Sequence, residues 1–236
     1  MLAVSPNNAK ALWYLTRGTG VVTLLLLTAS VVLGILQVTR WSSARWPRFV
    51  TAGLHKNVSL LVVVFLSVHI ATAVIDPFAP IRWLDAIVPF GSAYRPLWLG
   101  LGAIGCDLLI ALIVTSLLRV RIGYSRWRLV HWLSYACWPV ALVHGLGTGS
   151  DTRHPWALSI EALSVVLVAG AAWWRIGWSV TVPAGRRVIA ASGVAVAMLA
   201  TAVWTFSGPL QPAWARRAGT PAQLLPSTRR SATMPA

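Results

Sequence analysis

The stretch LVHWLSYACWPVALVHG, residues 129–145, places His131 and His144 inside an apolar run that is long enough to form a helix. An earlier apolar run carries His55 and His69 in the same way. An imidazole in hydrocarbon is costly unless it is hydrogen-bonded or bound to a metal, so an ionisable residue inside a membrane span is a candidate functional group. Four of the five histidines of the chain are therefore candidates of this kind.

The composition around these runs is that of a membrane protein. The 236 residues are 57% hydrophobic and only 11% charged, and the mean hydropathy is +0.70. Because about 20 apolar residues cross the hydrocarbon core of a bilayer, the sequence predicts an all-α, polytopic helix bundle of about six transmembrane helices, surrounded by lipid in the cell membrane. The expected spans are 20–38, 55–75, 97–118, 129–147, 156–174 and 188–206.

The chain divides into two parts by composition. Residues 1–206 form the predicted membrane domain, and residues 207–236 are rich in Pro, Ala, Ser, Thr and Arg. Such a composition buries little apolar surface, so we expect this tail to be disordered. The two cysteines, Cys106 and Cys137, lie in apolar runs and form no C-x-x-C pair, which excludes a disulfide framework or a thiolate metal site.

The positions of the basic residues indicate how the chain is oriented in the membrane. The 20 Lys and Arg residues against 5 Asp and Glu give a net charge of +15, but they gather in short segments between apolar runs and form no recognition motif, so nucleic-acid binding is not expected. The first, third and fifth connecting loops are the basic ones. By the positive-inside rule these loops face the cytoplasm and both termini face outside.

The spacing of the four histidines predicts two pairs between helices. His55 and His69 are 14 residues apart, about 21 Å along one face of a helix, and His131 and His144 are 13 apart, about 19.5 Å. One helix lies between the helix with the first two histidines and the helix with the last two, so these two helices run in the same direction. His55 is therefore expected to pair with His131, and His69 with His144. Thirteen residues leave about 220° after three turns of an ideal helix, which would point His131 and His144 to different faces. A kink or a locally altered turn near Pro139 is the expected means of bringing them to one face.

Facing imidazoles from two helices can hold a metal in a planar macrocycle, as helical bundles commonly do. Haem fits this arrangement because its iron takes axial ligands on both sides of the ring, whereas zinc needs a tetrahedral cluster at one depth. Two alternatives stay open at this point. Each histidine can simply be hydrogen-bonded within the bundle, or the protein can be a cofactor-free transporter that uses the histidines for proton coupling.

The sequence resembles the ferric reductase-like transmembrane domain family, which includes ferric reductases, NADPH oxidases and the haem-binding membrane subunit of methionine sulfoxide reductase systems. The resemblance rests on His-x13-His (His55, His69) followed one helix later by His-x12-His (His131, His144), over residues 15–175. It implies two b-type haems with these four histidines as axial ligands of the iron, and electron transfer from the cytoplasmic to the outer side.

One departure from the family affects the expected partners. Members that are self-sufficient reductases carry a flavin and nicotinamide domain, and no strand followed by G-x-G-x-x-G occurs in this chain. We therefore expect an electron-transfer membrane subunit of an oxidoreductase, with a separate donor (a flavoprotein or a quinol) and an extracytoplasmic acceptor that the sequence does not identify. A quinone-linked cytochrome b subunit of a larger complex remains an alternative, and catalysis by the chain itself stays open.

Two further sets of residues follow from a haem interpretation. Haem propionates are anionic and pair with basic side chains; the candidates are Arg48, Lys56, Arg126 and Arg128 on the inner side and Arg17 and Arg153 on the outer side. Aromatic side chains at depths between the two histidine pairs are candidates to fill the gap between haems; they are Phe65, Trp132, Tyr135 and Trp138.

Overall fold

A computed structural model describes residues 6–43, 46–178 and 182–225 of the chain. These residues form helices joined by loops, without a strand among them, and six of the helical stretches are long and apolar enough to cross a membrane. The predicted all-α bundle with about six transmembrane helices is confirmed.

The helices are generally longer than the apolar runs that predict them, because polar residues at the ends continue the helix beyond the hydrocarbon core. The bounds are α1 Pro6–Val38, α2 Arg48–Ile75, η1 Trp83–Ala86, α3 Pro96–Leu117, α4 Arg119–Ile122, α5 Tyr124–His131, α6 Ser134–Thr148, α7 Pro155–Trp178, α8 Ala184–Ser207, α9 Trp214–Arg217 and η2 Ala222–Leu224. α2 ends where expected, at Asp76-Pro77, since proline cannot continue a helix.

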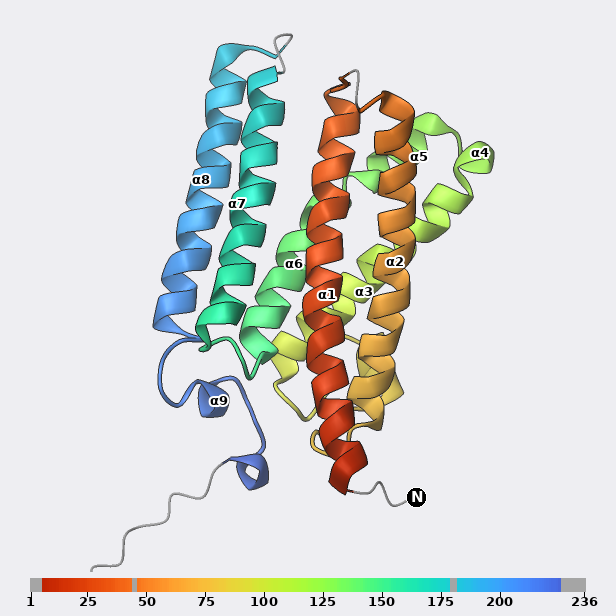
Figure 1. Ribbon diagram of the computed structural model, residues 1–236. Coiled ribbons are helices and arrows are strands. Elements are labelled where there is room, and N and C mark those ends of the chain that lie inside the picture. Colours follow the sequence, from red (N-terminus) through yellow and green to blue (C-terminus); the bar gives the residue numbers. More distant parts are fainter. Residues whose placement is uncertain (1–5, 44–45, 179–181, 226–236) are drawn as a thin grey trace, which may run out of the picture.

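The membrane helices pack as neighbouring antiparallel pairs. Figure 1 shows α1 beside α2, with α3 and α6 behind them and α7 with α8 at the side of α1 and α6. Buried side chains from α1, α2, α3 and α6 meet in the middle of the bundle, where they form one apolar core; its buried members include Leu27, Val62, Leu112, Trp138 and Leu142. This core lies between the depths of the two histidine pairs and fixes the four helices that carry or support them.

The fourth span is built differently from its prediction. Residues 119–128, expected as a basic loop, form α4 and the start of α5. The span is interrupted at Trp132–Leu133, and Pro139 lies farther along, inside α6. Around the interruption the backbone makes tight i to i+3 hydrogen bonds, such as Leu133 N–H to the Val130 carbonyl (2.9 Å) and Ala136 N–H to the Leu133 carbonyl (3.0 Å).

This tight turn explains how His131 and His144 reach one face. Each residue wound at three per turn rotates about 20° more around the helix axis than a residue of an α-helix. In an ideal α-helix His144 would lie about 220° around the axis from His131, and four tightly wound residues raise this angle to about 300°. The two histidines then lie within about 60° of each other around the axis. The local change in winding therefore does what a kink at Pro139 was expected to do.

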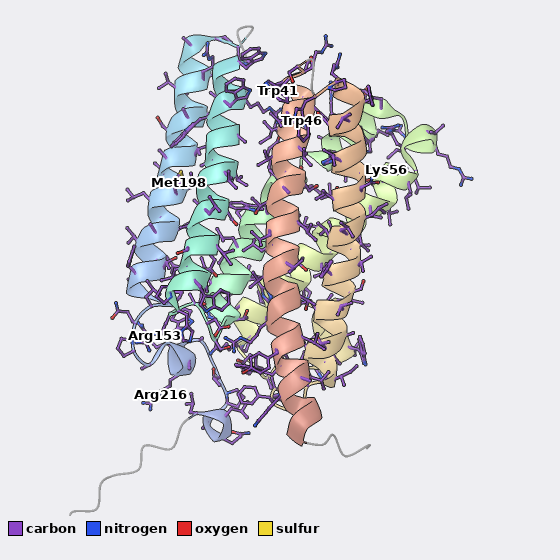
Figure 2. All side chains as sticks on the ribbon, in the orientation of Figure 1. Trp41, Trp46, Lys56, Arg153, Met198 and Arg216 are labelled. Carbon is purple, nitrogen blue, oxygen red and sulfur yellow. The ribbon has the colours of Figure 1, made fainter. Side chains whose placement is uncertain are left out.

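The two ends of the bundle differ. Trp41 and Trp46 lie at the end where α1 connects to α2, and Arg153 and Arg216 lie at the opposite end (Figure 2). The C-terminal segment, residues 208–225, also lies at that opposite end, where Arg95 and Trp214 hold it against α3 and α6. The composition predicts a disordered tail, whereas the structure packs residues 208–225 against the bundle; residues 226–236 lie outside the described part of the chain.

Candidate functional site

The four span histidines come together as two pairs at different depths of the bundle. The imidazole centroids of His55 and His131 are 6.4 Å apart, and those of His69 and His144 are 6.5 Å apart. We call these the inner pair, near the α1–α2 connection, and the outer pair, near the C-terminal segment. The pairing and the order of depths are those that the spacing predicts.

Three of the histidines share one way of being held by a neighbouring helix. The Nδ1 atoms of His55, His69 and His144 lie 2.9, 2.7 and 2.8 Å from the backbone carbonyls of Ser30, Thr16 and Trp98, respectively. Each carbonyl sits four residues before a glycine of the same helix, and the imidazole lies against that glycine; the three glycines are Gly34, Gly20 and Gly102.

Two of the glycines, Gly20 and Gly102, are needed because the imidazole rings approach the helix backbone closely. A Cβ atom at Gly102 would lie 2.5 Å from Cε1 of His144, and one at Gly20 would lie 2.9 Å from Cε1 of His69. A neutral imidazole that donates from Nδ1 has its lone pair on Nε2. The hydrogen bond to the carbonyl therefore fixes the tautomer, and the close contact with the helix fixes the orientation of the ring, as the hydrogen-bond partners of metal-binding histidines do.

His131 is held by stacking instead. Its ring lies 4.8 Å from the ring of Trp127 at an interplanar angle of 28°, and the Trp127 indole donates to the Ser116 hydroxyl (3.2 Å). The buried Nδ1 of His131 has no hydrogen-bond partner among the described residues. The inner pair is thus supported by a backbone carbonyl on the His55 side and by an aromatic face on the His131 side.

Trp138 fills the space between the depths of the two pairs. Its side chain is buried in the core, and its indole N–H donates to the Thr28 hydroxyl (2.9 Å). The other aromatic candidates for this position are arranged differently. Phe65 is half-buried, Trp132 is exposed, and the Tyr135 hydroxyl contacts the Arg175 guanidinium.

The geometry of each pair fits a single metal held between two imidazoles. With metal–nitrogen bonds of about 2.0 Å on each side, two such rings have centroids about 6.3 Å apart, close to the 6.4 and 6.5 Å of the two pairs. Within the described residues, no group of three or more His, Cys, Asp or Glu side chains is arranged to hold a metal ion. Two imidazoles facing each other across one gap are the arrangement of axial ligands that a haem iron takes.

The basic residues proposed as propionate partners are placed unevenly. Arg17 forms an ion pair with Asp151 and lies 3.7 Å over the Trp13 ring, which ties α1 to the loop before α7. Arg153 and Lys56 are exposed. The sequence analysis does not identify Arg95, a buried arginine at the start of α3 close to the outer pair. In the sequence Arg95 only precedes a proline and an apolar run, and neither feature indicates a function.

A groove opens at the outer end of α1 and α2. It has a volume of about 560 Å³ and is lined by the aromatic side chains of Trp13, Tyr14 and Phe78, with Lys10 and Asp76 as its charged groups. Thr16, whose carbonyl holds His69, lies two residues beyond Tyr14 in α1. The groove lies on the α1–α2 side of the outer end, and the C-terminal segment covers the α3–α6 side.

The fold and the two histidine pairs define a multi-pass membrane protein with two candidate cofactor sites. Residues 19–147, more than half of the chain, match the family described as ferric reductase like transmembrane component. The chain belongs to this family, whose members are generally haem-binding, and it is a membrane electron-transfer component. Comparison with curated proteins and with solved structures gives no match.

Proposed function

We propose that the chain is a membrane cytochrome b that transfers electrons across the cell membrane through two bis-histidine haems, as a subunit of a ferric reductase-like oxidoreductase. The observation that carries this proposal is the pair of imidazole separations, 6.4 and 6.5 Å, at two depths of the bundle. His55 and His131 would be the axial ligands of an inner haem, and His69 and His144 those of an outer haem.

The residues around the pairs supply orientation. The carbonyls of Ser30, Thr16 and Trp98 accept hydrogen bonds from Nδ1 and so direct Nε2 of three histidines toward the gap within each pair. The surrounding apolar side chains exclude water. A haem held in each gap would supply one-electron carriers at two depths, because its iron changes between the ferric and ferrous states.

The charge distribution suggests where electrons enter. Arg119, Arg121, Arg126 and Arg128 lie on α4 and α5, at the inner end. We assign this end to the cytoplasm and to a separate donor, a flavoprotein or a quinol. The acceptor would then meet the outer pair, from the side of the groove between α1 and α2.

The first test is a reduced-minus-oxidised visible spectrum of the detergent-purified protein, with haem quantified per chain. Two b-type haems per chain are expected. A folded, colourless protein after expression with ample haem would contradict the proposal and favour a cofactor-free transporter.

Alanine variants test the assignment of ligands. His144→Ala and His69→Ala should each lower the content from two haems to one, because each removes one axial ligand of the same site. His154→Ala is the matched control, since its side chain is 63% exposed at the outer end; it should keep both haems. Retention of two haems in both ligand variants would contradict the pairing.

A further inference from the structure

We propose that Arg95 and the C-terminal segment together form a clasp that positions His144 and so keeps the axial coordination of the outer haem closed. This inference rests on the proposed function. It concerns residues outside the four candidate ligands, and it gives the segment after the last membrane helix a specific task at the outer site.

Arg95 is the centre of the clasp. Its side chain is buried, with the residue 6% exposed. Nη1 donates to the carbonyls of Gly147 (3.1 Å) and Thr148 (2.9 Å), and Nε donates to the Thr220 hydroxyl (2.9 Å). One guanidinium thus joins the start of α3, the end of α6 and the C-terminal segment.

The positive charge of Arg95 is stabilised by the carbonyl groups at the C-terminal end of α6. Within the described residues, no carboxylate forms an ion pair with Arg95. The carbonyls of Gly147 and Thr148 belong to the last turn of α6, where carbonyls lack partners within the helix and the helix dipole is negative. The guanidinium therefore satisfies the end of the helix that carries His144, one turn after that histidine.

Trp214 makes a second connection to the same turn. Its indole N–H donates to the Gly147 carbonyl (3.1 Å), and its ring lies 5.2 Å from the ring of Trp98. The Trp98 ring occupies the space beside Gly147, where a Cβ would lie 2.5 Å from it. The Trp98 carbonyl holds Nδ1 of His144. Trp214 therefore contacts both the turn after His144 and the residue that orients its imidazole, and Arg95 contacts the same turn.

The backbone of the C-terminal segment is docked as well. The Arg95 N–H donates to the Gly219 carbonyl (3.1 Å). Gly219 has φ of +87°, and a Cβ there would lie 3.1 Å from Cδ of Pro96, so a larger residue would be strained and would crowd α3. Ala218, the preceding residue, is 4% exposed. The segment is therefore packed against the start of α3 rather than merely linked to it.

The clasp acts on one site only. These contacts involve residues 95–98, 144–148 and 208–225, all at the outer end, and the inner pair is held by other groups. Release of the clasp should therefore loosen the ligand His144 and leave His55 and His131 in place. A loosened axial ligand is detected by carbon monoxide, which binds ferrous haem only where an axial position becomes free.

The experiment compares Arg95→Met with Arg216→Met in the full chain. Arg216 is an exposed arginine of the same segment, so its variant controls for the loss of charge. In Arg95→Met, carbon monoxide should bind one of the two haems, whereas the wild type and the control should bind none. Trypsin should also cleave after Arg217, a site that both variants keep, about tenfold faster than in the control, since a lost hydrogen bond to a charged group shifts a local opening equilibrium by about that factor.

A milder variant keeps the test decisive if Arg95→Met does not fold. Thr220→Val removes only the hydroxyl that accepts from Arg95 and nearly preserves the volume of the side chain. It should show the same changes to a smaller extent. Two haems closed to carbon monoxide in the folded variants, whether or not trypsin cleaves faster, would overturn the positioning role. A wild type without haem would instead overturn the proposed function itself.

Discussion

Three of the four histidines are held in the same way: a backbone carbonyl of another helix binds Nδ1, and a glycine four residues further along that helix leaves room for the ring. The carbonyl of residue i points along the helix toward residue i+4, and the absence of a Cβ there lets an imidazole reach it. The arrangement occurs at Thr16–Gly20, Ser30–Gly34 and Trp98–Gly102. At Gly20 and Gly102 the residue is thus required by a histidine on another helix, whereas a Cβ at Gly34 would make an ordinary contact with His55.

Gly102→Ala should therefore displace His144. The new Cβ would lie 2.5 Å from Cε1 of the imidazole, and overpacking of this kind typically costs about 1–3 kcal/mol. We expect the haem content to fall from two per chain toward one, with the loss at the outer site. The measurement is haem quantification together with the thermal stability of the purified protein.

Gly105→Ala is the matched control on the same helix. A Cβ there would meet only Cγ1 of Val140, at 3.8 Å, an ordinary contact. Alanine also has a higher helix propensity than glycine, by about 1 kcal/mol. This variant should keep both haems and be at least as stable as the wild type. An equal loss of haem in the two variants would show that the close approach to His144 is not the cause.

At the scale of elements, the sequence predicts the number and position of the spans because apolar length is a local property. It also predicts the pairing of the histidines, since their spacing along two parallel helices is nearly equal. It does not place the tight turn at residues 129–136, because these residues carry no turn signature and the proline that suggests an altered turn, Pro139, lies farther along the span.

The C-terminal segment shows a different limit of sequence reasoning. Its composition indicates disorder, yet Trp214 and Thr220 are held by partners on α3 and α6. These contacts join residues far apart in the chain, and local composition carries no information on them. Arg95 was missed for the same reason, since only the folded chain brings it to the end of α6.

The loop between α2 and α3 carries an acid-sensitive contact. Asp85 is 3% exposed and accepts hydrogen bonds from the Arg82 backbone N–H (2.9 Å) and from Nη2 of Arg82 (2.8 Å). Burial alone would raise the pKa of Asp85, but the hydrogen bonds and the charge of Arg82 outweigh it and lower the pKa. The contact stabilises the loop above the unfolded-state pKa of about 3.9 and is lost as the pH falls through the lower folded-state value.

We therefore expect faster amide exchange at residues 83–88 in strongly acidic solution, after correction for the intrinsic pH dependence of exchange. Asp85→Asn should show this faster exchange at neutral pH, because a neutral side chain leaves Arg82 without its ionic partner. The check is hydrogen exchange followed by mass spectrometry. Equal protection of the loop in the variant and the wild type at neutral pH would contradict the role of the carboxylate.

At the scale of the whole molecule, the net positive charge is concentrated at the inner end, because acidic loop residues offset basic residues only at the outer end. The inner end has basic residues on α2, α4, α5 and the start of α8. The five acidic residues of the chain lie elsewhere, three in outer loops and two inside spans; they are Asp76, Asp85, Asp107, Asp151 and Glu161. Such a separation favours an anionic donor at the inner end, since unlike charges steer encounter.

Two flavins with the same ring system test this steering. Reduced flavin mononucleotide carries a phosphate that reduced riboflavin lacks, so only its reaction should depend strongly on the basic end. We expect stopped-flow reduction of the detergent-purified protein by the mononucleotide to slow by about tenfold from low to high ionic strength. Reduction by riboflavin should change little. The double variant Arg126→Gln/Arg128→Gln should weaken the salt dependence and lower the rate at low salt.

The matched control places the same change of charge at the other end. Arg153 and Arg216 are exposed there (Figure 2), so Arg153→Gln/Arg216→Gln removes two positive charges without touching α4 or α5. Its rate with flavin mononucleotide should stay close to that of the wild type, because the charges lie most of a membrane thickness away from the entry point and are screened within about 8–10 Å. If both double variants slow the reaction equally, net charge and not the basic inner end governs the encounter.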